Sequence, residues 1–139
     1  MDEERDDRGD AATNEGHCLC GAVRFAFDGE ASWRSHCHCE SCRRQTASPF
    51  TTFFGIPDGR WRWTGETPAA HASSPGVTRR FCRRCGTPVS FESERCPGEI
   101  HFYAALLVDH AGFEPECHDF WGERVSWVEP CDELPRKGG

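Results

Sequence analysis

The sequence predicts a mostly β protein built from short strands, for three reasons. Apolar and polar residues alternate over residues 22–27 and 60–64, which is the period of a strand with one buried face. Asp-Gly pairs at residues 28–29 and 58–59 mark turns beside these two segments. No convincing amphipathic pattern extends beyond two helical turns.

The other elements follow from the same patterns. A loop is expected over residues 65–76, where Gly, Pro, Ser and Ala are concentrated. Trp121 and Trp127 are expected to pack against the rest of the protein from the last strand. We predict strands over residues 32–38, 50–56, 100–108 and 120–128, one helical turn over 40–45, and a strand–turn–strand unit over 77–92.

The net charge of −7 is unevenly distributed along the 139 residues. Residues 1–15 carry −5 of it, which predicts a disordered acidic tail. The remaining chain is nearly neutral and lacks the basic surface typical of nucleic-acid-binding proteins. No run of 18 apolar residues and no export signal is visible. We therefore expect a cytoplasmic protein without a membrane span or a nucleic-acid partner, in an oligomeric state that the sequence leaves open.

Ten cysteines in 139 residues is a high count, which indicates either disulfides or metal ligands. Seven of them lie in C-x-C or C-x-x-C spacings, which suit ligands of one metal ion better than long-range disulfides. Since no export signal is visible, the sequence favours zinc over a disulfide framework. Cys96, Cys117 and Cys131 lie outside these spacings and are expected to be free thiols, with a mixed disulfide to a small external thiol as the alternative.

Two distant pairs form the first predicted zinc site. We call Cys18, Cys20, Cys82 and Cys85 the four-cysteine group. Four thiolates fill the tetrahedral shell of zinc, so such a site is closed and structural. Its negative charge is expected to be offset by the nearby arginines at positions 79, 80, 83 and 84.

The second predicted site is incomplete. We call Cys37, Cys39 and Cys42 the three-cysteine group. Three protein ligands and one exchangeable position are typical of catalytic zinc, which can bind an external thiol as thiolate. His36 or His38 could instead close the site as a fourth ligand. On an extended segment, however, both histidines should point away from Cys37 and Cys39.

Two further residues near or beyond these groups are open to alternative roles. Glu40 is either a general base or a solvated carboxylate. His118 is either a proton donor or a structural residue.

Three segments together resemble the glutathione-dependent formaldehyde-activating enzyme family, to which centromere protein V also belongs. They are GHCLCGAV at residues 16–23, HCHCESCRR at 36–44 and FCRRCGTP at 81–88. The likeness extends over residues 16–135, which predicts one zinc-binding domain there and a short C-terminal tail at 136–139.

The resemblance implies a β-tent of several short, coiled antiparallel sheets with two zinc ions per chain. It assigns the four-cysteine group to the structural zinc, and Cys37, Cys39 and Cys42 to the catalytic zinc. The implied activity joins formaldehyde, or a related aldehyde, to glutathione or another small thiol; the reverse reaction makes the enzyme a carbon–sulfur lyase. The alternatives are a thiol-binding carrier or sensor without turnover, and a zinc-stapled module that binds protein or nucleic acid.

Overall fold

The computed structural model describes residues 13–139 and confirms a mostly β protein, with two sheets and one α-helix. The larger sheet has the strand order β11-β4-β5-β10-β9-β8-β7, and the smaller sheet has the order β2-β3-β6. The bounds are β2 Thr13–His17, β3 Arg24–Asp28, β4 Trp33–Cys37, α1 Glu40–Thr46, β5 Thr51–Pro57, β6 Trp61–Trp63, β7 Ala69–Ser74, β8 Val77–Phe81, β9 Pro88–Ser93, β10 Glu99–Tyr103 and β11 His118–Asp119.

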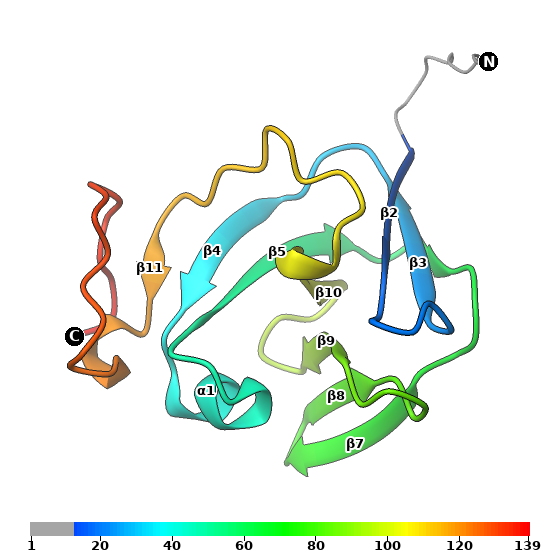
Figure 1. The fold of residues 1–139 in the computed structure, drawn as a ribbon, viewed down its shortest axis with the longest axis horizontal. Coiled ribbons are helices and arrows are strands. Elements are labelled where there is room, and N and C mark those ends of the chain that lie inside the picture. The colour runs from blue at the N-terminus through cyan, green and yellow to red at the C-terminus, as the bar shows by residue number, and fades with distance from the viewer. Residues whose placement is uncertain (1–12) are drawn as a thin grey trace.

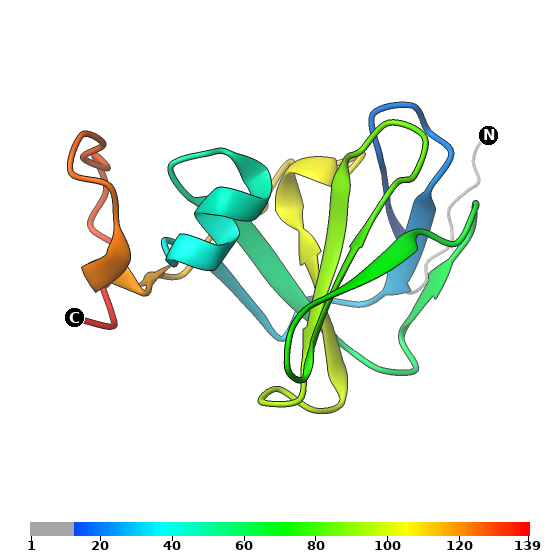
Figure 2. The ribbon, with the colours of Figure 1, turned by 90° about the horizontal axis from the view of Figure 1, so that it is seen from below.

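The elements are spread along the long axis of the molecule (Figure 1). The C-terminal segment lies at one end, α1 lies next to it, and the smaller sheet lies at the other end. The view from below keeps the same order, with the hairpin of β7 and β8, at the edge of the larger sheet, in the foreground (Figure 2). None of the helices in residues 13–139 is long and apolar enough to cross a membrane.

The main core lies between the two sheets. Phe25 of β3 stacks on Phe102 of β10 with ring centroids 4.0 Å apart. Phe27 packs on Phe54 of β5 at 5.1 Å. All four rings are at most 5% exposed, and Ile56 beside them is fully buried. Burial of these aromatic and aliphatic groups is the principal force that joins the smaller sheet to the larger one.

The opposite face of the larger sheet carries a second, smaller core. Cross-strand pairing aligns Ser35, Phe53 and Tyr103, so these side chains share one face. Cys37 lies two residues after Ser35 and faces the same way, and it packs with Phe53, Tyr103 and Cys42 of α1. The register of β4, β5 and β10 thus places the three-cysteine group on the face that the main core leaves free.

The predicted strand over residues 120–128 is absent. Phe120 has a positive φ of 56°, and a 3-10 helix over Trp121–Glu123 follows it. A left-handed residue breaks the extended path, so the alternation in this segment does not become a strand. Trp121 is buried as predicted, whereas Trp127 is 72% exposed and the prediction that it packs is wrong.

The loop predicted over residues 65–76 contains the strand β7. Its residues are mostly exposed, and they pair with β8 at the edge of the sheet. A polar edge strand has no buried face to create an alternating pattern, so its own sequence does not reveal it. The strand predicted over 100–108 is shorter than expected, because a 3-10 helix over Ala104–Leu106 follows β10.

Some of the residues assigned to the tails at 1–15 and 136–139 form backbone hydrogen bonds with the rest of the fold. Residues 1–12 lie outside the described part of the chain, but residues 13–15 belong to β2 and pair with β3. At the other end, the Lys137 amide donates a hydrogen bond to the His118 carbonyl. The carbonyls of Lys137 and Gly138 accept hydrogen bonds from the amides of Trp121 and Gly122. Residues 136–138 are therefore part of the fold.

Removal of residues 136–139 is expected to lower the free energy of unfolding by about 2–4 kcal/mol. The deletion removes three backbone hydrogen bonds, each contributing about 0.5–1.5 kcal/mol. Urea unfolding of the full and shortened chains measures the difference. Equal midpoints and slopes would show that these residues are a free tail after all.

Candidate metal centres

The four-cysteine group assembles from two distant turns. Its four sulfurs all lie within 4.8 Å of one another. Cys18 Sγ and Cys82 Sγ each lie 3.7 Å from Cys20 Sγ. Cys18 and Cys20 follow β2, whereas Cys82 and Cys85 lie in the turn between β8 and β9. The group therefore joins the smaller sheet to the larger one through side chains.

Backbone amides and a hydroxyl hold these sulfurs in place. The amides of Val23 and Arg84 donate to Cys18 Sγ at 3.3 Å and to Cys82 Sγ at 3.4 Å. Thr87 Oγ1 lies 3.1 Å from Cys85 Sγ, and this contact lowers the pKa of Cys85 to about 5. Such N–H and O–H donors favour the thiolate form that a metal requires.

Each turn of the group ends in a glycine with left-handed backbone. Gly21 and Gly86 have φ of 84° and 82°. A side chain would strain this conformation, so the glycine after each cysteine pair keeps the turn tight.

The arginines near this group are fewer than predicted. Arg84 lies beside it and also binds Glu66 at 2.7 Å. Arg80 forms an ion pair with Glu92 at 3.0 Å. Arg79 does not belong to this group at all, because its guanidinium approaches the three-cysteine group.

The three-cysteine group forms where β4 passes into α1. Cys37 ends β4, Cys39 caps α1, and Cys42 lies in the first turn of that helix. Cys37 Sγ lies 3.4 Å from Cys39 Sγ, and the Cys42 amide donates to Cys39 Sγ at 3.3 Å. Hydrogen bonds from Cys37 and Cys42 lower the pKa of Cys39. The Cys37 thiol and the Cys42 amide both donate to Cys39 Sγ, which favours the thiolate form of Cys39.

Within residues 13–139, no histidine, carboxylate or further cysteine joins this group as a fourth ligand. His36 and His38 lie on the other side of the strand, where both contact His118. The prediction that they point away from the cysteines is confirmed. The alternative in which either histidine closes the site is wrong for this arrangement.

Arg79 and Tyr103 lie beside the three-cysteine group. The sequence had assigned Arg79 to the four-cysteine group, and Tyr103 was not singled out from it. The two terminal nitrogens of Arg79 lie 3.8 Å and 3.9 Å from Cys42 Sγ. Arg79 is 5% exposed. It also lies over the Phe91 ring. Tyr103 packs against Cys37 and Cys42. The alternation of β10 gave a signal for Tyr103, but Arg79 reaches the group only through the pairing of β8 with β9.

The sulfur spacing of both groups fits zinc. Tetrahedral zinc with sulfur at about 2.3 Å separates its ligands by about 3.8 Å. The distances of 3.7 Å in the four-cysteine group and 3.4 Å in the three-cysteine group are close to that value. The donor set of soft thiols also matches zinc rather than magnesium or calcium. Both groups can therefore hold a zinc ion, one with four protein ligands and one with three.

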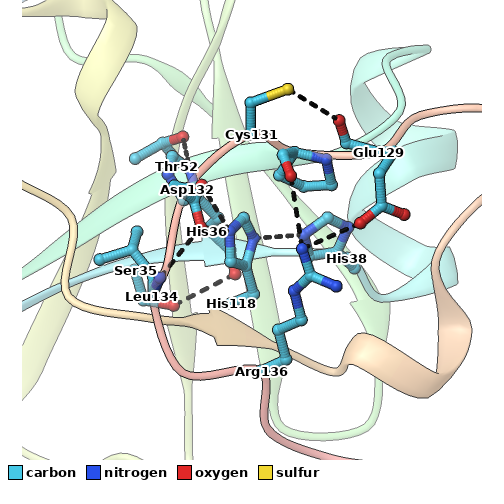
Figure 3. Close-up of polar contacts among 11 residues, drawn as sticks. Ser35, His36, His38, Thr52, His118, Glu129, Cys131, Asp132, Leu134 and Arg136 are labelled. Carbon is cyan, nitrogen blue, oxygen red and sulfur yellow. Dashed lines mark hydrogen bonds and ion pairs between the residues drawn. The ribbon is translucent and has the colours of Figure 1, made fainter.

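A buried histidine cluster lies on the other side of the β4 segment from the three-cysteine group. Figure 3 shows its polar contacts. His118 Nε2 lies 3.0 Å from Asp132 Oδ2, and His118 Nδ1 lies 2.8 Å from His38 Nε2. Because a carboxylate only accepts, His118 donates to Asp132 and, when neutral, accepts from His38. His36 stacks on His118 and bonds Thr52 at 2.8 Å.

This cluster is part of the interior of the protein. His118 is fully buried and His38 is 2% exposed, and burial lowers the pKa of His38 to about 4. The contacts support the structural alternative for His118, since its two ring nitrogens already have partners.

The remaining candidates have simpler explanations. Cys96, Glu99 and His101 offer ligand atoms within 4.8 Å of one another, but Glu99 already accepts hydrogen bonds from Trp33 and His101 at 2.9 Å and 2.6 Å. These polar groups satisfy one another without a metal. Glu40 is exposed and forms an ion pair with Arg44 at 2.8 Å, as a solvated carboxylate would. The other two cysteines, Cys117 and Cys131, lie outside every metal-ligating group in residues 13–139.

Asp132→Ala is expected to lower the free energy of unfolding by about 1–3 kcal/mol, because it leaves the buried His118 Nε2 without an acceptor. Glu133→Ala is the matched control, since it removes the neighbouring exposed carboxylate. Thermal or urea unfolding measures both. If the two variants were equally stable, the His118–Asp132 contact would not stabilise the fold.

Partial chelation is expected to remove zinc from the three-cysteine group before the four-cysteine group. Three ligands hold an ion less tightly than four. After the first loss, the four-cysteine group should therefore keep its ion, at about one zinc per chain. Elemental analysis during a chelator titration gives the count, and a melting curve at each step shows which loss unfolds the protein. Simultaneous loss of both ions would contradict the assignment.

Comparison with known proteins agrees with this geometry. The sequence model of the family described as glutathione-dependent formaldehyde-activating enzyme matches residues 13–123. An uncharacterised lyase of Schizosaccharomyces pombe is 31% identical over 76% of this chain and 84% of its own length. A Halomonas elongata protein, provisionally named a glutathione-dependent formaldehyde-activating enzyme, is 28% identical over 83% of this chain and 79% of its own.

A solved structure shares the fold. The crystal structure of a Rhodobacter sphaeroides protein aligns with a TM-score of 0.57 at 20% identity, and the alignment covers 88% of this chain and 99% of that one. The matched family segment spans both cysteine groups and most of the described residues. The chain therefore belongs to the glutathione-dependent formaldehyde-activating enzyme family.

Proposed function

We propose that this protein is a zinc-dependent lyase-type enzyme that forms and cleaves the carbon–sulfur bond between a small thiol and formaldehyde or a related aldehyde. Glutathione is the thiol that the family name indicates. The supporting observation is the contrast between the two groups: four sulfurs converge in one, and only three in the other, within residues 13–139. Three ligands leave one position of a tetrahedral ion for substrate.

The proposal assigns a role to each group. The four-cysteine group (Cys18, Cys20, Cys82 and Cys85) would hold a structural zinc, and Cys37, Cys39 and Cys42 would hold the catalytic one. A zinc ion at the three-cysteine group would supply Lewis acidity and keep a bound thiol ionised. We also propose that the two sheets form the β-tent typical of the family, in a cytoplasmic protein whose domain extends over residues 13–138.

The residues around the three-cysteine group suit a reaction at sulfur. The Arg79 guanidinium beside Cys42 offsets part of the negative charge that three thiolates bring together. Phe53 and Tyr103 form the apolar wall behind the sulfurs and keep water away from that side. The reaction needs no redox partner: the thiol sulfur bonds to the aldehyde carbon, the C=O π pair moves to oxygen, and the thiol proton ends on that oxygen.

We expect the formation and cleavage of the adduct of glutathione and formaldehyde to be faster with the protein than without it, as measured by exchange NMR. Cys42→Ser should abolish the acceleration and reduce zinc from about two to about one per chain, because it removes a ligand of the proposed catalytic site. Cys131→Ser, at an exposed thiol outside both groups, is the control. The comparison with the uncatalysed rate is essential, since this addition also proceeds without an enzyme.

A cobalt-substituted sample separates the remaining alternatives. A glutathione-dependent change of the cobalt spectrum without faster exchange would indicate a thiol carrier or sensor instead of an enzyme. No spectral response to any thiol would indicate that both sites are closed. The protein would then be a binding module in which both zinc ions are structural.

A further inference from the structure

We infer that the hydroxyl of Tyr103 binds the oxygen atom of the aldehyde and stabilises the charge that this oxygen gains as the carbon–sulfur bond forms. The inference rests on the proposed function, and it names the residue that recognises the second substrate. The supporting observation is a buried hydroxyl that has no acceptor among residues 13–139.

Tyr103 is held firmly beside the three-cysteine group. It is the last residue of β10, where it pairs with Phe53 of β5. The two rings pack with centroids 4.5 Å apart, and Tyr103 is 5% exposed. The same buried cluster contains Cys37 and Cys42. Its backbone position and its ring are thus both fixed, so the hydroxyl is held in place within the buried cluster that contains Cys37 and Cys42.

The Tyr103 hydroxyl has no hydrogen-bond partner among residues 13–139. A buried O–H without an acceptor is unfavourable, so one that lies beside a reactive site is a candidate for a hydrogen bond to a ligand. Arg79 lies close enough to donate to the Tyr103 oxygen, but it cannot accept the hydroxyl proton, because a guanidinium carries donors only. The Tyr103 O–H is therefore a donor without an acceptor, and it lies beside a guanidinium that already contacts Cys42 Sγ.

An aldehyde oxygen is an acceptor of the required kind. It carries two lone pairs before the reaction and gains negative charge as the C=O π pair moves onto it. A pre-positioned donor in a buried site stabilises that charge more than the neutral carbonyl, which lowers the barrier. The proton lost by the thiol completes the product hydroxyl, so Tyr103 donates a hydrogen bond and need not lose its own proton.

Tyr103→Phe tests this role, because it keeps the ring that packs on Phe53 and removes only the hydroxyl. We expect exchange above the uncatalysed rate to fall by about 10- to 1,000-fold. Glutathione should still bind, within about twofold of the wild-type midpoint in the cobalt spectrum, since the sulfur site is unchanged. The melting temperature should stay equal or rise, because the variant removes an unpaired buried polar group.

Ser90→Ala is the matched control. Ser90 is fully buried, and its hydroxyl also has no partner among the described residues. It pairs in register with Phe102, so it lies on the opposite face from Tyr103. Ser90→Ala should leave turnover unchanged. The two variants therefore differ in whether the lost hydroxyl faces the three-cysteine group.

The outcomes separate this inference from the proposed function. Wild-type turnover in Tyr103→Phe would overturn the inference while leaving the lyase activity intact. A lower melting temperature together with weaker glutathione binding would show a structural role and would also overturn it. Absence of acceleration by the wild-type protein would overturn the proposed function, and this inference with it.

Discussion

Successive side chains along β4 and the extended residues after it point to opposite sides of the chain, and both chemical features of the protein depend on this alternation. Cys37 and Cys39 face α1, while His36 and His38 face His118. A shift of one residue in the pairing of β4 with β5 would exchange the two sets and destroy both. The register is therefore fixed by a polar cluster on one side and by a sulfur group on the other.

The two cysteine groups contribute to the fold in different ways. The four-cysteine group joins residues that are 62 positions apart, as in Cys20 and Cys82, so an ion there closes a long loop. The three-cysteine group lies within six residues and closes almost none. Its geometry is held instead by α1, by the Cys42 amide and by the histidine cluster behind it. An ion at the second group is thus less important for folding, which is compatible with a position kept open for substrate.

The sequence was sufficient to predict the parts of the molecule that are local. The close spacing of the cysteines predicted the two ligand pairs and the three-cysteine group, and the alternation of β4 predicted where His36 and His38 lie. The polar edge strand β7 and the bend at Phe120 could not be predicted in this way, because they depend on pairing with β8 and on a left-handed residue. Arg79 was assigned to the nearer cysteines in the sequence, although pairing with Phe91 carries it to the other group.

The position of Arg79 also explains why the second group can remain incomplete. Three close thiols in an apolar surrounding repel one another when ionised, and a fourth protein thiol would add to that repulsion. A buried guanidinium 3.8 Å from Cys42 Sγ offsets this charge without becoming a ligand, because arginine has no lone pair to offer a metal. The four-cysteine group faces solvent through the exposed Cys20 and does not need such a buried cation. Burial of Arg79 beside the sulfurs therefore favours a charged, three-ligand site that still has room for an external thiol.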